Sequence, residues 1–161
     1  MLETETKIYA FMRSAFDLLL TGVDESKFAD QPMPGMNPPA WILGHLAIVA
    51  DRGCEVLGAP RQLSEAWHTQ FGPGSTPSSK LSDYPSKAEL LAALDAGHAR
   101  LSSLALAADP ALLAEPHGRE RIAALLPTKG DLVAMMMTAH EGTHLGQLST
   151  WRRCIGIPPL F

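Results

Sequence analysis

The chain has 161 residues, 46% of them hydrophobic and 19% charged, a composition typical of one folded globular domain covering residues 1–161. Its formal net charge of −4 and its lack of a Lys/Arg cluster argue against nucleic-acid binding. The N-terminus lacks the basic start and apolar stretch of a signal peptide, and the longest apolar run, residues 41–50, is too short to span a bilayer. We therefore expect a cytoplasmic protein that binds no membrane.

Two long helical patterns occupy the first third of the chain. The first covers about residues 3–20 and ends at Gly22. The apolar stripe that we expect to face the core is Ile8, Phe11, Met12, Ala15, Leu18 and Leu19. The second helix is expected to begin with Asn37 as its N-cap and Pro38 as its first residue, both favoured at those positions, and to stop at Gly58.

Two further helical patterns follow a long connection. The third helix opens with a capping box formed by Ser86 and Glu89, and the pair Asp109-Pro110 ends it. The fourth begins near Thr128 and continues until Gly156. No strand alternation appears between the four patterns, so the sequence predicts an all-α four-helix bundle.

The connection between the second and third helices covers residues 59–85, and its second half is rich in Gly, Pro and Ser. Segments of this length in a compact domain are usually functional or mobile. Trp67, His68 and Phe71 give this one apolar anchors. We expect a crossover that folds over one end of the bundle.

The stretch His140-Glu141-Gly142-Thr143-His144 carries the strongest functional signal. Histidines four residues apart on a helix present their imidazoles to one point, as a zinc-like ion requires. His45, on the inward stripe of the second helix, is the best third ligand, because facing helices bring such side chains to one centre. We predict that these three histidines bind one divalent ion. Three imidazoles suit Zn, Ni, Cu or Fe, of which we favour Zn or Ni.

The same stretch matches the HExxH string of zincin metallopeptidases, in which the glutamate is a general base. Two roles for Glu141 therefore stay open: a catalytic general base, or a carboxylate on the surface or beside the ligands. Gln147 is either a substrate-binding group at the open side of the metal or a polar residue of the bundle. Trp67 and His68 on the crossover are candidates for substrate binding. The remaining histidines are expected at an edge and in a loop: His98 and His117.

Three segments together resemble the DinB-like superfamily over nearly the whole chain: residues 37–46 (NPPAWILGHL), the aromatic-anchored crossover, and residues 140–147 (HEGTHLGQ). The resemblance implies a four-helix bundle of up-up-down-down type, a divalent metal bound by His45, His140 and His144, and frequent homodimerisation. Members with assigned activities include metal-dependent transferases and isomerases that use low-molecular-weight thiols.

Three functional hypotheses follow. The leading one is a metal-dependent enzyme, a thiol-dependent S-transferase or a hydrolase, in which the ion activates a water or a low-molecular-weight thiol cosubstrate to act on a small molecule. The second is a zincin-type peptidase, which the lack of a third ligand downstream of His144 and of any strand argues against. The third is a non-catalytic metal-binding bundle that serves as a dimeric interaction module.

Overall fold

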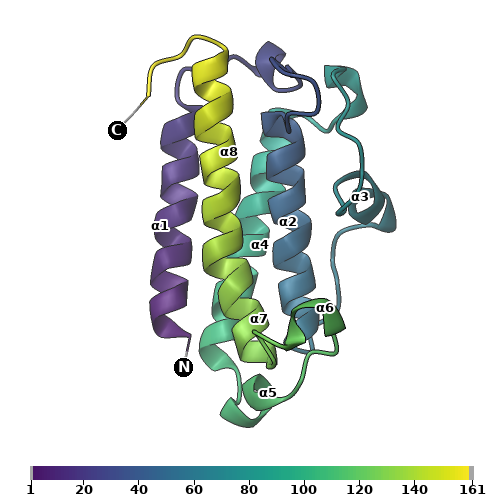
Figure 1. Cartoon of the computed structure of the whole chain (residues 1–161), viewed down its shortest axis with the longest axis vertical. Helices are drawn as coiled ribbons and strands as arrows, with labels where there is room; N and C mark the ends of the chain where they lie inside the picture. The colour runs from purple at the N-terminus through teal and green to yellow at the C-terminus, as the bar shows by residue number, and fades with distance from the viewer. Residues whose placement is uncertain (1, 160–161) are drawn as a thin grey trace.

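The computed structural model describes residues 2–159, which form helices joined by loops (Figure 1). The bundle consists of α1 (Glu3–Leu20), α2 (Pro39–Val56), α4 (Lys87–Ala107) and a last rod made of α7 (Lys129–Met135), η3 (Met136–His140) and α8 (Glu141–Cys154). The shorter elements are η1 (Glu25–Lys27), α3 (Glu65–Gln70), η2 (Leu81–Asp83), α5 (Pro110–Ala114) and α6 (Glu120–Ala123). No strand occurs within the described range, so the predicted all-α bundle is confirmed.

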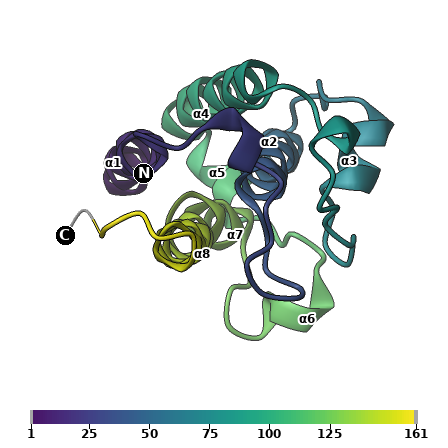
Figure 2. The same ribbon diagram turned by 90° about the horizontal axis from the view of Figure 1, so that it is seen from above.

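Seen end-on, α1 and α2 lie on opposite sides of the bundle, each between α4 and α8 (Figure 2). α1 and α8 run in one direction, and α2 and α4 run in the other (Figure 1). The start of α4 accordingly lies next to the end of α1, where the backbone N–H of Lys87 donates to Glu25. The order of directions is therefore up-down-down-up, and the up-up-down-down order that the resemblance implied is wrong. Because α2 and α4 are parallel, the chain between them returns along the side of the bundle (Figure 1), and the expectation that it folds over one end is wrong.

Two of the expected helix starts are built as the sequence predicts. Ser86 and Glu89 form a capping box at α4, and Thr128 and Asp131 form another at α7. The start of α2 differs by one residue from the prediction, because Pro38 is its N-cap and Pro39 its first helical residue. No helix within the described part of the chain is long and apolar enough to cross a membrane.

α1 has the predicted bounds, but only part of the expected stripe faces the core: Ala15 and Leu19 are buried, and the face is rotated away from the rest of the stripe. Phe11 and Leu18 of the expected stripe are 67% and 56% exposed. The residues it buries are Tyr9, Ala15, Phe16, Leu19 and Leu20. This helix carries apolar residues on two stripes, and the buried one holds two large aromatic rings, whose burial removes much apolar surface from water.

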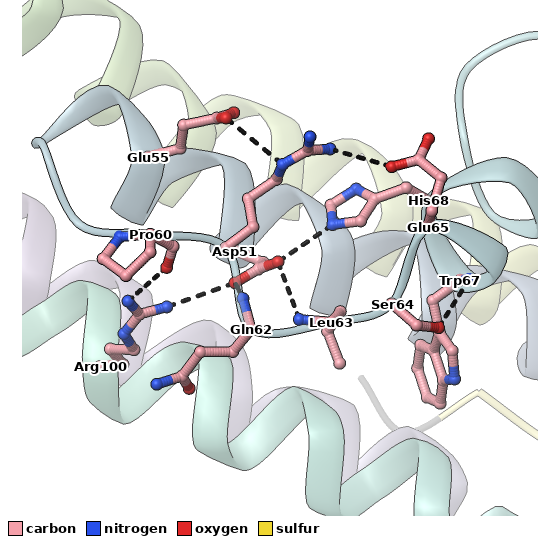
Figure 3. Close-up of polar contacts among 11 residues, drawn as sticks. Asp51, Glu55, Pro60, Gln62, Leu63, Ser64, Glu65, Trp67, His68 and Arg100 are labelled. Carbon is pink, nitrogen blue, oxygen red and sulfur yellow. Dashed lines mark hydrogen bonds and ion pairs between the residues drawn. The ribbon is translucent and has the colours of Figure 1, made fainter.

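The crossover is fastened to the bundle by the buried carboxylate of Asp51 in α2 (Figure 3). The backbone N–H groups of Gln62 and Leu63 donate to this carboxylate, at 2.8 and 3.1 Å. The Nε2 atom of His68 in α3 lies 3.0 Å from it, and Nη1 of Arg100 in α4 lies 3.3 Å from it. These contacts offset the cost of burying the carboxylate, and they fix the path of the crossover against both helices.

Candidate metal centre

Three histidines from two distant parts of the chain converge inside the bundle. His45 lies in α2, His140 ends η3 and His144 lies in α8. One ring nitrogen of each lies within 4.8 Å of the other two, and the Nε2 atoms of His45 and His140 are 3.3 Å apart. The convergence expected from the spacing of these residues is thus present in the fold.

The sequence predicted one uninterrupted α-helix for the rod that carries two of these histidines. The structure differs in one turn of this rod. Residues Met136–His140 form a π-helical turn between α7 and α8. A π turn holds about one residue more than an α turn and so shifts the side-chain directions on its two sides by about 100°. Such turns are frequent at functional sites, and here the turn ends on His140.

Two of the imidazoles are oriented by acceptors on their Nδ1 atoms. Nδ1 of His45 lies 2.7 Å from the carbonyl oxygen of Phe71, and Nδ1 of His144 lies 3.0 Å from Oε1 of Gln147. Carbonyl and amide oxygens only accept hydrogen bonds, so each Nδ1 must carry the proton and donate. The lone pair of each ring is therefore on Nε2, and hydrogen bonds of this kind fix the tautomer of histidine ligands in metal sites.

Phe71 reaches His45 because the crossover approaches α2 closely at Gly44. A Cβ atom at this position would lie well inside contact distance of the Phe71 ring, so a larger residue would displace the crossover. On the other side of the imidazole, Trp41 stacks on His45 with ring centroids 4.6 Å apart, and its indole Nε1 donates to Ser75 at 2.9 Å. The crossover therefore helps to hold the His45 ring from two directions.

Gln147 is held in place by a second hydrogen bond. Its Oε1 atom also accepts from the side-chain amide of Asn37 at 3.1 Å. Asn37 was predicted to cap α2, and the structure uses its side chain to position Gln147 instead. The start of α2 is thereby linked to the ring of His144.

The surroundings of the three histidines keep them uncharged. Burial lowers the pKa of His45 to about 4 and that of His144 to about 3, and it also lowers the pKa of His140. All three imidazoles are consequently neutral near pH 7, which is the form that binds metal. Among residues 2–159, Nδ1 of His140 is buried with no hydrogen-bond partner. The donor set therefore fits a divalent ion.

The lowered pKa of His45 predicts that acid destabilises the metal-free protein. The unfolded chain has the higher pKa and takes up more protons below about pH 6.5, so stability falls as the pH drops toward 4. From about pH 7 to pH 5 His45 alone accounts for roughly 2 kcal/mol of the free energy of unfolding. Urea unfolding of chelator-treated protein at the two pH values measures this loss. An equal loss in a His45→Gln variant would show that the effect does not come from this ring.

Glu141 points away from the histidine cluster. Its side chain is 1% exposed, and its Oε1 atom lies 3.2 Å from Nε2 of His98 in α4. Burial raises the pKa of Glu141, an effect that His98 opposes. The carboxylate lines neither of the two pockets that open beside the cluster.

The expectation that His98 lies at an edge is wrong. This histidine is buried, and its ring stacks on Tyr9 with centroids 3.7 Å apart. The helical spacing of Leu94, His98 and Leu101 puts all three on one face, and this spacing was the available signal. His117 lies in the loop between α5 and α6, as expected, where Nε2 contacts the carbonyl oxygen of Leu126.

The other predicted site residues divide between the pockets and the crossover. Gln147 lines a pocket along η3 and α8 together with His140 and His144. Trp67 and His68 line neither pocket beside the cluster. Trp67 packs against Phe71, and His68 contacts Asp51 (Figure 3). Both support the segment that orients His45.

The two pockets share Met135, His140 and His144 and differ in the rest of their lining. The one beside Gln147 has a volume of about 310 Å³. The other has a volume of about 260 Å³, and its remaining lining residues are His45, Val49, Arg52, Pro73, Arg119 and Met136. The cluster is thus open to molecules from outside. Arg119, in the connection of residues 115–127, carries no sequence signal for this position.

The family model for the DinB superfamily matches residues 8–148. The matched region contains all three histidines of the cluster and the whole crossover. A comparison with curated proteins finds none that matches this chain.

Proposed function

The chain belongs to the DinB superfamily, and on that premise we propose that it is a cytoplasmic metalloenzyme that binds one divalent ion, Zn or Ni, through His45, His140 and His144. The observation that carries the proposal is the convergence of three neutral imidazoles at the wall of an open pocket. A catalytic metal site typically has three protein ligands and one position left for water or substrate.

The metal would supply a nucleophile near neutral pH by lowering the pKa of a water or thiol that binds at the open position. The residues of this chain prepare the site. Phe71 and Gln147 hold two of the imidazoles in the neutral tautomer that leaves Nε2 free. Val49, Met135 and Met136 form an apolar wall that would exclude water from a bound small molecule. We propose S-transfer from a low-molecular-weight thiol, or hydrolysis, as the reaction.

A structural, non-catalytic ion is the alternative. Closed structural sites usually have four protein ligands. Within residues 2–159 the group around His45 contains no fourth His, Cys, Asp or Glu. This composition supports a site with an open position over a non-catalytic interaction module.

The position of Glu141 supports a transferase or hydrolase over a zincin-type peptidase. A zincin needs this carboxylate at the metal as a general base, whereas here it contacts His98 in the core. The bundle also offers no sheet edge that would hold an extended peptide, within the described residues.

The reaction class can be tested with the metal-loaded parent protein and two variants, Glu141→Gln and His140→Ala. We expect metal-dependent consumption of a thiol with an electrophile, modestly reduced by Glu141→Gln and abolished by His140→Ala. Unfolded casein serves as the peptidase substrate and should stay intact. Metal-dependent casein cleavage that disappears in Glu141→Gln would contradict this proposal and favour the zincin.

We further propose that the protein forms a homodimer through the outer face of α1 and α8. Phe11 and Leu18 are exposed there, and both line an apolar hollow of about 410 Å³ together with Met12, Ala15 and Leu145. Apolar patches of this kind often mark protein interfaces.

Light scattering coupled to size exclusion should give a dimer for the parent protein and a monomer for the variant Phe11→Glu/Leu18→Glu. The introduced charges would have to be buried in the interface, which is costly. Leu125→Glu is the control, because Leu125 is 87% exposed on a different part of the chain. A monomeric parent, or a double variant that stays dimeric, would show that this face is not the interface.

A further inference from the structure

Two arginines face the same pocket as the three histidines. Arg52 lies in α2 seven residues after His45, a rise of about 10 Å along the same side of the helix. Arg119 comes from the connection before α6. Both line the pocket of about 260 Å³ that His45, His140 and His144 close at one side. Cationic side chains and the candidate metal ligands therefore surround one small volume.

In the described part of the chain these two arginines lack a direct carboxylate partner, although the charges of Glu55 and Glu65 act on Arg52 at longer range. Among residues 2–159, neither guanidinium forms an ion pair or a side-chain hydrogen bond. By contrast, Arg13, Arg61 and Arg100 each pair with a carboxylate. Half-buried Arg52 has a lowered pKa, mainly because of burial and next because of the charge on Arg119. Two like charges that repel each other at a pocket wall are the arrangement that a bound anion would stabilise.

The remaining walls of the pocket are apolar. Besides the arginines and the histidines, the lining consists of Val49, Pro73, Met135 and Met136. A ligand that fits this lining has an acidic group, a short apolar body and a reactive group next to the imidazoles. Guanidinium groups suit a carboxylate because their planar donors match its two oxygens.

We propose that Arg52 and Arg119 bind the carboxylate of a small organic acid, which is the substrate class of this site. The assignment of the acid as a substrate rests on the proposed function, since the metal would act on its other end. Recognition of the carboxylate by the two arginines does not depend on the metal.

The test uses benzoate as the probe and benzamide as its uncharged counterpart, titrated into the full chain by NMR, both metal-loaded and chelator-treated. We expect benzoate to bind about tenfold more tightly than benzamide in both forms. Arg52→Gln and Arg119→Gln should each weaken benzoate binding by about tenfold and leave benzamide binding unchanged. Arg153→Gln is the control, because it removes one positive charge from the last turn of α8, where Arg153 contacts Ser149 and Thr150 and lines neither pocket beside the cluster. Its benzoate affinity should equal that of the parent.

Equal binding of benzoate and benzamide would overturn the proposal, and so would an equal loss in Arg153→Gln. Tighter binding of phenyl phosphate than of benzoate would show that the carboxylate assignment is wrong. Measuring the metal content of the same samples shows whether a failure concerns this inference or the proposed function. If the parent binds no metal but its affinity for benzoate falls in Arg52→Gln, only the proposed metalloenzyme is contradicted. If the parent binds metal but shows no preference for benzoate over benzamide, only this inference is contradicted.

Discussion

Replacing His140 with alanine is expected to lower the metal content of the purified protein from about one ion per chain to almost none. His140 supplies one of three converging imidazoles, and two remaining nitrogens hold a divalent ion far more weakly. His45→Ala and His144→Ala should have the same effect. Elemental analysis after chelation, reloading with Zn or Ni and desalting gives the stoichiometry.

His117→Ala is the matched control for this experiment. It also removes an imidazole, but its ring contacts Leu126 in a loop and belongs to no group of metal-ligating side chains within the described chain. Its metal content should equal that of the parent. Full metal retention by His140→Ala and His45→Ala would refute the assignment of these ligands.

The variant His98→Ala is expected to lower the free energy of unfolding by about 3–5 kcal/mol. The change leaves the carboxylate of Glu141 buried with no partner and removes a ring that stacks on Tyr9. Breaking a buried pair by removing one member is among the more destabilising single changes. Urea unfolding monitored by circular dichroism measures the effect.

A double variant, His98→Leu/Glu141→Leu, separates the destabilisation caused by lost packing from that caused by leaving the Glu141 carboxylate without a partner. Apolar residues of similar volume often replace a buried polar pair at little cost. The double variant should therefore be more stable than His98→Ala. If it is less stable, the contact between His98 and Glu141 stabilises the fold by itself, and the explanation from an unpaired carboxylate fails.

The parts of the fold that depend on local sequence could be predicted. Capping residues such as Ser86 with Glu89 act within one turn, so they mark a helix start wherever the helix later packs. The i, i+4 spacing of His140 and His144 is also a local feature, so it predicted that these two imidazoles converge. The place of His45 on the inward stripe of its helix predicted the third imidazole.

Other features depend on contacts between distant segments. The acceptor for His45 is a backbone carbonyl, that of Phe71, and no side-chain pattern marks it. Arg119 reaches the pocket from an irregular connection, where no helical periodicity indicates a direction. α1 carries two apolar stripes, so its core face depended on which stripe the neighbouring helices covered. His98 is different, because its spacing from Leu94 and Leu101 did indicate burial.

X-ray absorption spectroscopy of the zinc-loaded protein tests the central claim most directly, because it identifies the atoms bound to the ion. We predict scattering from three imidazole rings, with Zn–N distances of about 2.0–2.1 Å, and one further light-atom donor. The imidazole contribution should fall in any His45→Ala protein that still carries zinc. A spectrum dominated by sulfur or carboxylate donors, without imidazole scattering, would contradict the three-histidine centre.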